Sequence, residues 1–292
     1  MYNFAHAAMA AEFEIHCTHP DEAYARQAAR FAFGAVDRLE RQLSRFAENS
    51  DISRINHLAA GESTRVGYET MQCLQLARLV WAETGGAFDV SIGTGFERLE
   101  LMAGEFVVRA HADGVRLDLG AIGKGYAVDR VAEALEEWEV TEALIHAGRS
   151  SVLALEPPSG RDGWPLTLSM PGGGRGTGTG SGAGSGAVFA RMAARQRALG
   201  ASGIQKGDHI LDPRDRTPVQ SREAAWVSAP RQVLAGIGRQ AGVEGSAAAV
   251  ADGLSTAFMI SPAGEIDKYC QRHPGLEAWI LQQGELRHFV AP

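Results

Sequence analysis

The sequence contains few cysteines and no cysteine motif. Its three cysteines, Cys17, Cys73 and Cys270, form no Cys-x-x-Cys pair and leave an odd count. This pattern excludes a disulfide framework and a cysteine-based zinc site, and it is typical of a reducing compartment. A catalytic thiol stays open as an interpretation, beside the simpler one of three buried small apolar side chains.

Long apolar runs are also missing. No stretch reaches the about 18 apolar residues of a membrane-spanning helix. His6, Glu12 and Glu14 interrupt the first residues, which carry neither the basic segment nor the apolar core of a signal peptide. We therefore expect no stable membrane insertion. As the sequence stands it indicates a cytoplasmic protein, or an exported one if a leader has been removed.

Basic charge is scarcer than acidic charge. The net charge is −7 and the isoelectric point is near 5.7. Such a balance excludes a surface built to neutralise phosphate backbones, so no nucleic acid is expected as a partner. With 45% hydrophobic and 22% charged residues, the chain is typical of a globular protein with a substantial core. We expect one domain over residues 1–292.

Periodicity predicts an α+β inventory. Alternation over 11–17 predicts a strand with Phe13, Ile15 and Cys17 on one face. Further strands are expected as two short pieces within 106–118 and over 142–147, 150–155, 164–170, 277–282 and 286–290. Residues 191–201 are expected to be helical or irregular.

Helical patterns occur at five places. One begins at Pro20-Asp21, with Phe31, Ala35, Leu39 and Leu43 along its apolar stripe. The others are expected over 50–54, capped by Ser50, and over 68–83, 122–137 and 246–259. We expect no helix after residue 259.

A low-complexity tract, GGGRGTGTGSGAGSGA, fills residues 172–187. It lacks the GxxxxGK[ST] pattern of a phosphate-binding loop. Its composition favours a flexible surface insertion between two strands, because glycine- and serine-rich segments do not offset their ordering entropy.

Three segments carry residues suited to chemistry. The first, residues 115–130, predicts a strand, a glycine-rich turn and a helix bearing Lys124. Glycines allow close backbone approach to an anion, and lysine adds a positive charge. The segment is thus either a phosphate site or a tight turn with Lys124 in solvent.

The other two segments are weaker signals. His209 and Asp212 flank a turn, and such a pair suits proton transfer as well as an ordinary surface position. Asp252 and Thr256 lie four residues apart in an expected helix. Their side chains therefore share one helix face, where both oxygens can reach the same hard cation.

Seven motifs in order resemble the ApbE family of FAD:protein FMN transferases. They span about residues 9–258, and their counterparts here are Met9, Ser44-Arg45-Phe46, SDISRIN at 50–56, TGGAFD at 84–89, DLGAIGKGYAVD at 118–129, HILDP at 209–213 and ADGLSTA at 251–257. The resemblance implies an α+β fold of mixed sheets flanked by helices in two closely packed lobes, similar to the T-fold, with FAD in the cleft.

The resemblance also implies a set of site residues. FAD would contact a set comprising Met9, Phe46, Ala87, Phe88, Asp89, Asp118, Lys124, His209 and Ile210. A magnesium ion would lie between the Ala121 carbonyl, Asp252 and Thr256. Lys124 and Asp252 would serve the chemistry directly, and His209 or a nearby carboxylate would take the proton.

The implied reaction transfers FMN from FAD to a threonine hydroxyl of an acceptor protein and releases AMP. Two other functions use the same site: a magnesium-dependent FAD pyrophosphatase that yields FMN and AMP, and a non-catalytic FAD-binding protein. An unrelated α+β module that matches by chance is the fourth possibility. The acceptor protein and the oligomeric state stay open.

Several positions depart from the family pattern. Where the family has Met-Gly-Thr, this chain has Met9-Ala10-Ala11. Where the family has Gly-Gly-Asn or Gly-Gly-Asp, it has Gly148-Arg149-Ser150. Ser202-Gly203-Ile204 lacks a tyrosine that often follows this Ser-Gly. In residues 212–218, Arg216 replaces a turn glycine. The metal and lysine positions are kept, so these changes bear more on protein transfer than on FAD binding.

Overall fold

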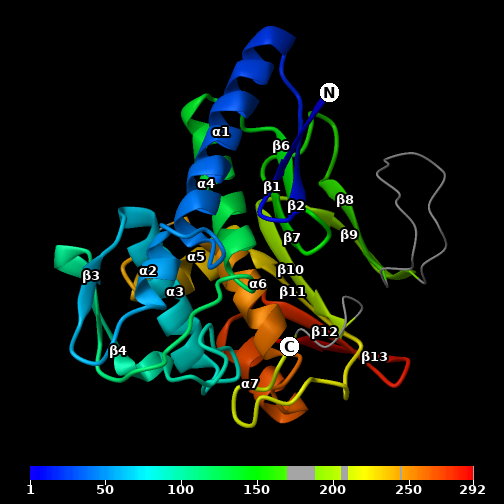
Figure 1. Ribbon diagram of the computed structural model, residues 1–292. Helices are drawn as coiled ribbons and strands as arrows, with labels where there is room; N and C mark the ends of the chain where they lie inside the picture. Colours follow the sequence, from blue (N-terminus) through cyan, green and yellow to red (C-terminus); the bar gives the residue numbers. More distant parts are fainter. Residues whose placement is uncertain (170–187, 205–209, 244, 292) are drawn as a thin grey trace.

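One large sheet runs through the molecule. The structure, a computed structural model, describes residues 1–169, 188–204, 210–243 and 245–291 (Figure 1). The sheet has eight strands in the order β1-β2-β6-β7-β10-β11-β12-β13. All its strand pairs are antiparallel. The strands are Tyr2–Ala8 (β1), Ala11–Cys17 (β2), Ala143–Ala147 (β6), Ser151–Ala154 (β7), Arg197–Gly203 (β10), Ala224–Pro230 (β11), Glu277–Gln282 (β12) and Glu285–Val290 (β13).

Helices cover this sheet, which confirms the α+β class. They are Glu22–Leu43 (α1), Asp51–Ile55 (α2), Tyr68–Glu83 (α3), Gly123–Glu137 (α4), Arg231–Gln240 (α5), Ala247–Ala257 (α6) and Ala263–Arg272 (α7), with short 3₁₀ helices at Phe96–Arg98 and Ala103–Glu105. Helix α6 lies centrally, in contact with β7, β10 and β11 on one side and with α3, α4 and α5 on the other. Figure 1 shows α4 and α6 between the large sheet and the α2–α3 region.

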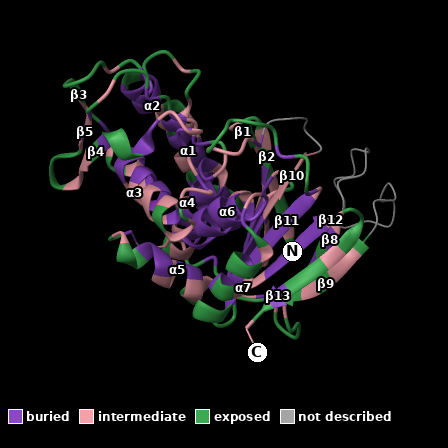
Figure 2. Cartoon of the chain, turned by 90° about the horizontal axis from the view of Figure 1, so that it is seen from below, coloured by how far each residue is buried: buried purple, intermediate pink, exposed green. Residues whose placement is uncertain are grey.

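Two glycines allow this central packing. A Cβ atom on Gly125 of α4 would lie 2.3 Å from the Ala248 carbonyl oxygen of α6. One on Gly200 of β10 would lie 2.3 Å from the backbone of Ala251. Any larger residue would push α6 away from its neighbours. The helix is accordingly buried along most of its length (Figure 2).

Helix α1 buries a different stripe from the predicted one. Leu39 and Leu43 are buried as expected, but Phe31 is 45% exposed. The N-terminal half of the buried face is formed by alanines, at positions 25, 28, 29 and 32. Small side chains let α1 approach α4 closely, so the stripe of largest residues was the wrong guide to the buried face.

A small sheet in the order β3-β5-β4 lies beside α2 and α3. Its strands are Ser63–Arg65 (β3), Leu99–Met102 (β4) and Val107–Ala110 (β5). The second strand predicted within 106–118 does not form. The Asn56 side chain accepts a hydrogen bond from Leu117 N at 2.6 Å and donates one to Leu117 O at 3.0 Å. These bonds use the backbone groups that a neighbouring strand would need.

The prediction for residues 191–201 is wrong. They belong to Val188–Ala194 (β9) and β10, joined through Gln196 at φ +45°. Pairing of β9 with Trp164–Ser169 (β8), and of β10 with β7 and β11, overrides the local helix preference of alanine and arginine. Helices α5 and α7 were also missed. Each is only ten residues long with three buried positions, so its apolar face spans few helical turns.

The glycine-rich tract, residues 172–187, lies outside the described residues; the strands on either side of it, β8 and β9, pair with each other. Within the described ranges, none of the helices has both the length and the apolar composition needed to cross a membrane. The cytoplasmic location stays a prediction.

Candidate active site

The turn before α4 places Lys124 at the start of the helix. The amides of Ile122 and Gly123 both donate to the Leu119 carbonyl, at 3.1 and 2.7 Å. The Lys124 Nζ donates to the Gly120 carbonyl at 2.9 Å, and the residue is half-buried. The ammonium group is therefore fixed over the glycine-rich turn rather than extended into solvent. This geometry fits an anion-binding position.

Asp252 is the buried carboxylate of this site. It is 4% exposed, and its Oδ2 accepts hydrogen bonds from Gly125 N at 2.8 Å and from Ser151 Oγ at 2.6 Å. Its Oδ1 is buried and has no partner within the described residues. Burial raises the pKa of Asp252 to about 6, against the opposing effects of Lys124 and the two hydrogen bonds. An unpaired oxygen in this position requires an explanation, because an unsatisfied buried acceptor is costly.

A second aspartate forms the reciprocal contact between the same two helices. Asp129 on α4 accepts hydrogen bonds from the amides of Ala248 and Ala249 at the start of α6, both at 2.9 Å. Asp252 on α6 accepts the amide of Gly125 at the start of α4. Each helix thus supplies a carboxyl group that accepts free amides at the other's N-terminus. The sequence reasoning assigned no role to Asp129.

Thr256 and Ala121 stand beside Asp252. Thr256 lies one helical turn after it on α6, and its Oγ1 is 2.9 Å from Ser202 Oγ. The Ala121 carbonyl precedes the first turn of α4, and no hydrogen bond to it is recorded in the described part of the chain. The Gly125 amide, which would bond this carbonyl in a regular helix, donates to Asp252 instead.

These three groups fit a hard cation. The unpaired Asp252 Oδ1, the Thr256 hydroxyl and the free Ala121 carbonyl are all oxygen donors of the kind that Mg²⁺ binds. One carboxylate among neutral donors suits an ion that also binds waters or phosphate oxygens. No cluster of three or more His, Cys, Asp or Glu side chains with metal-binding geometry occurs in the ranges described.

Three residues predicted for flavin contact lie around the turn. The Met9 methyl group lies next to Gly123. Asp118 accepts the amide of Gly120 at 2.9 Å and pairs with Arg45 at 3.0 Å. The Arg45 guanidinium stacks on Phe46, 4.4 Å from the ring centroid. The Phe46 ring is 82% exposed, and such an exposed aromatic ring is available to a planar ligand.

The turn at residues 87–89 is less open. Phe88 is 1% exposed and packs against the α6 position Gly253, so its side chain belongs to the core. The Asp89 carboxylate accepts hydrogen bonds from Ser91 N and Oγ and from Gly93 N, at 2.7, 2.8 and 2.9 Å. Ala87 is half-buried. A ligand at this turn would therefore meet mainly its backbone.

A turn from the C-terminal half reaches the same loop. The Arg216 guanidinium donates to the Gly93 carbonyl at 2.7 Å, and a Cβ on Gly93 would collide with the Pro213 carbonyl. Ile210 is 7% exposed and anchors this turn. His209 lies outside the described residues, so its predicted role stays a prediction.

The cysteines are free and buried. Burial raises the pKa of Cys17 to about 11, and that of Cys73 and of Cys270 to about 12. Thiols of this kind are protonated at neutral pH and poor nucleophiles, which favours the buried apolar interpretation.

Comparison with known proteins identifies the family. The model of the ApbE family matches residues 9–97 and 93–280. The chain belongs to the ApbE family. A curated FAD:protein FMN transferase of Klebsiella pneumoniae is 26% identical over 248 residues, which are 76% of this chain and 75% of that protein.

Solved structures agree with the ApbE fold. The flavin transferase ApbE from Vibrio cholerae has a TM-score of 0.79 at 16% identity, covering 99% of this chain and 96% of that one. The apo flavinyl transferase ApbE of Pseudomonas stutzeri has a TM-score of 0.77 at 20% identity, with 99% and 94% covered. The Thermotoga maritima ApbE protein has a TM-score of 0.77 at 21% identity, with 99% and 96% covered.

Two departures from the ApbE pattern replace glycines yet keep the glycine conformation. Ala10, in the turn between β1 and β2, has φ +54°. Arg216, in the turn of residues 212–218, has φ +61°. Left-handed backbone at non-glycine residues is strained by about 1 kcal/mol. The turn shape therefore survives at both positions despite the lost glycine, and Arg216 gains the contact to Gly93.

Sequence reasoning missed the Asp252 contact of Ser151. Ser151 is fully buried in β7, and its hydroxyl lies 101 positions from its partner in the chain. A serine in an otherwise apolar stretch, Ser-Val-Leu-Ala-Leu, is the only signal that the sequence offers. That signal marks a buried hydroxyl without indicating its partner.

Proposed function

We propose that this chain transfers FMN from FAD to a threonine hydroxyl of an acceptor protein and releases AMP. The unpaired Oδ1 of Asp252, held beside Lys124 at the glycine-rich turn, is the observation that carries the proposal. Membership of the ApbE family and the names of its relatives support it. We treat residues 1–292 as one catalytic domain, since the family match runs from 9 to 280.

Magnesium is the proposed cofactor. Asp252, Thr256 and the Ala121 carbonyl would hold it, and its charge would stabilise the pyrophosphate of FAD as negative charge develops on the leaving AMP. Ser151 and Gly125 bind Asp252 Oδ2, which orients the carboxylate with Oδ1 toward the proposed ion.

Lys124 would also bind pyrophosphate oxygens through its ammonium group. Its ammonium group is already held at the turn by the Gly120 carbonyl, so little side-chain entropy is lost on binding. Phe46 and Met9 would contact the rings of FAD, and Asp118 would orient Arg45 and the turn. Ile210 and the backbone of residues 87–89 complete the proposed contacts.

The proposed transfer is one displacement at phosphorus. The threonine oxygen forms a bond to the FMN phosphorus, the phosphoanhydride bond to AMP breaks, and the threonine proton passes to a base. His209 is our proposed base. The same geometry with water as nucleophile would give an FAD pyrophosphatase, and binding without either step would give an FAD-binding protein.

One experiment separates these functions. Purified protein is incubated with FAD, with and without Mg²⁺, and AMP and FMN are followed by chromatography. The incubation is repeated with an acceptor protein that contains candidate threonines. Mg²⁺-dependent AMP together with flavin covalently bound to the acceptor supports the transferase. Free FMN in equal amount to AMP supports the hydrolase, and intact FAD in every sample contradicts both enzymes.

A further inference from the structure

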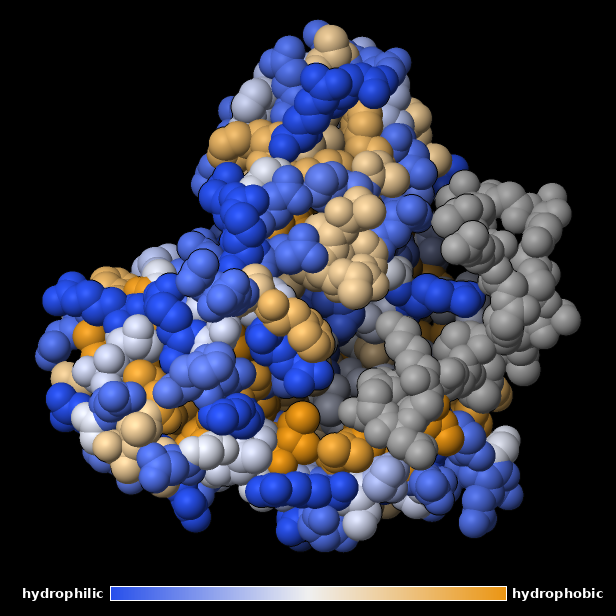
Figure 3. All heavy atoms as spheres, viewed as in Figure 1, coloured by the Kyte–Doolittle hydropathy of each residue, from blue (hydrophilic) through white to orange (hydrophobic). Residues whose placement is uncertain are grey.

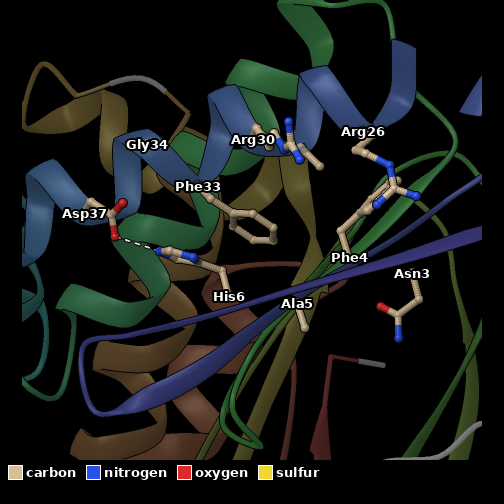
Figure 4. Close-up of a pocket in the computed structure, with 10 residues that line it drawn as sticks. Asn3, Phe4, Ala5, His6, Arg26, Arg30, Phe33, Gly34 and Asp37 are labelled. Carbon is tan, nitrogen blue, oxygen red and sulfur yellow. Dashed lines mark hydrogen bonds and ion pairs between the residues drawn. The ribbon is translucent and has the colours of Figure 1, made fainter. Parts of the chain in front are cut away.

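A groove runs between β1 and α1, away from the candidate active site. Its volume is about 420 Å³. Strand β1 forms one wall and residues 26–37 of α1 form the other (Figure 4). The residues that line it are Asn3, Phe4, Ala5, His6, Arg26, Ala29, Arg30, Phe33, Gly34 and Asp37.

Strand β1 is an open edge of the eight-stranded sheet, since β2 is its only partner among the described strands. The turn after it has two residues, Met9 and Ala10, both at positive φ, which is the geometry of a tight hairpin. In such a hairpin the two residues that flank the turn, Ala8 and Ala11, form both backbone hydrogen bonds with each other. Along β1 the hydrogen-bonded pairs then alternate with pairs that form no backbone bonds to each other.

This alternation decides which backbone groups of β1 are free. The amides and carbonyls of residues 2, 4, 6 and 8 point toward β2. Those of Asn3, Ala5 and Ala7 therefore point outward, where another strand can pair with them. Asn3 and Ala5 also line the groove.

The edge lacks the features that usually prevent strand addition. Its seven residues, Tyr-Asn-Phe-Ala-His-Ala-Ala, include no proline, lysine or other fully charged side chain. Its register with β2 is continuous, without a bulge. Natural edge strands are normally protected by such charges, prolines or bulges, so an unprotected edge is typical of a surface that receives a partner strand.

The helix wall carries the charge that would select the partner. Arg26 stacks on Phe4 at 5.4 Å and pairs with Glu22, while Asp37 is bound by His6 at 2.6 Å. Arg30 is exposed, and no ion pair to it is recorded in the described residues. Figure 4 shows the Arg26 and Arg30 side chains on the α1 side of the groove. The two nearby carboxylates, Glu22 and Asp37, are already engaged in these pairs, so the exposed Arg30 favours a partner that carries negative charge.

The edge leads to the candidate active site. Strand β1 ends at the Met9–Ala10 turn, and Met9 packs next to Gly123, the residue before Lys124. We propose that the acceptor protein docks here: an extended, acidic segment of it adds as a strand to the β1 edge, with its carboxylates toward Arg26 and Arg30. This inference rests on the proposed transferase function, and it explains how a protein acceptor is guided toward the turn.

The test uses the full chain and two labelled peptides. Each has the seven-residue length of β1. One alternates valine with glutamate around a central threonine, and the other alternates valine with lysine around the same threonine. Binding is measured by fluorescence anisotropy, without FAD, for the wild type, for Ala5→Pro, for Arg26→Glu/Arg30→Glu and for the control Arg239→Glu, an exposed arginine on α5.

We expect the acidic peptide to bind wild type about tenfold more tightly than the basic one. Ala5→Pro removes an outward amide without removing a bond to β2, and it should weaken the acidic peptide about tenfold. The double arginine variant should reverse the preference, and Arg239→Glu should leave it unchanged. Thermal melting checks that each variant is folded.

Equal binding of both peptides, absence of binding, or unchanged binding to the double arginine variant would each overturn the docking proposal. Mg²⁺-dependent cleavage of FAD is measured in parallel on the same variants. None of the three altered residues is part of the proposed catalytic machinery, so this cleavage should persist. Absence of peptide binding to the wild type with its FAD cleavage intact counts against docking alone, and absence of cleavage in wild type counts against the proposed function alone.

Discussion

The two aspartates that join α4 and α6 have similar surroundings but differ in their hydrogen bonds. Both are buried, and both accept backbone amides at the start of the other's helix. Asp129 uses both oxygens in this way, whereas Asp252 uses one and leaves the other unpaired. A fold needs only the first arrangement. The second is costly for stability, and this cost is the reason why we propose a ligand at Oδ1.

Surface hydropathy does not reveal this difference. Hydrophilic residues cover much of the face in Figure 3, and apolar residues occur there in small groups. Asp252 itself is buried in the central helix. The difference between the two aspartates is therefore seen in the hydrogen bonds of their buried carboxyl groups.

Removing the Asp252 charge should have the largest effect. Asp252→Asn keeps an acceptor for Gly125 and Ser151 but loses the anionic oxygen, so we expect Mg²⁺-dependent AMP release to fall about 10³-fold. AMP is measured by chromatography, and thermal melting checks the fold. Wild-type turnover in this variant would rule out Asp252 as a metal ligand, and loss of cooperative unfolding would make it a structural residue like Asp129.

Asp129 should make stability depend on pH. Burial raises its pKa to about 7, against the two amide hydrogen bonds and Arg130 that lower it. Because the folded state holds this proton more tightly than the unfolded chain does, its contribution is full below about pH 4 and is lost as pH rises through about 7. Glu133, also raised to about 7, acts in the same direction.

We therefore expect the free energy of unfolding to fall by about 3 kcal/mol between pH 4 and 7 from Asp129. Urea unfolding of wild type and Asp129→Asn across this range measures it. A wild-type profile as flat as that of the variant would show that Asp129 titrates normally.

Truncating Asp129 should cost stability and spare the chemistry. Asp129→Ala leaves the amides of Ala248 and Ala249 without an acceptor, and we expect a loss of about 2 kcal/mol at pH 5. AMP release per folded molecule should stay within about twofold of wild type. A much larger loss of turnover at full folding would give Asp129 a role in the reaction.

The smallest effect should come from Ser151. Ser151→Ala removes one of the two bonds that orient Asp252, so the Mg²⁺ concentration at half-maximal activity should rise about tenfold. Mg²⁺ titration of the AMP-release rate measures this shift, and the control is Ser228→Ala, which alters a buried serine of β11 bonded to the Ala198 carbonyl. An equal shift in the control would show that the effect is not specific to the Asp252 contact.

Local patterns predicted the elements whose sequence periodicity agrees with their packing. Helix α3 matches its predicted range of 68–83, and Phe13, Ile15 and Cys17 are fully buried on β2 as expected. The prediction failed where tertiary pairing decides the outcome. Residues 191–201 form strands because β7, β8 and β11 provide partners, and nothing within the segment indicates this.

The candidate site shows the same contrast between residues in local motifs and residues in long-range contacts. Lys124, Asp252 and Thr256 could be predicted as candidates because their motifs are local in sequence. Ser151 was missed because its contact links strand β7 to helix α6 across 101 positions of the chain. Phe88 was expected at the flavin, but its side chain is in the core, since a motif does not distinguish a residue that supports a turn from one that touches a ligand.

The bond from Gly125 N to Asp252 Oδ2 also makes the site observable without turnover. That amide donates to the carboxylate whose other oxygen is proposed to bind the cation, so its proton chemical shift should follow the charge at Asp252. Exchange of the Gly125 amide proton with solvent deuterium should also slow on ion binding, because the bound ion would hold α4 and α6 together more firmly. In a ¹⁵N-labelled sample, the Gly125 resonance would thus be a spectroscopic reporter of ion binding placed within the backbone itself.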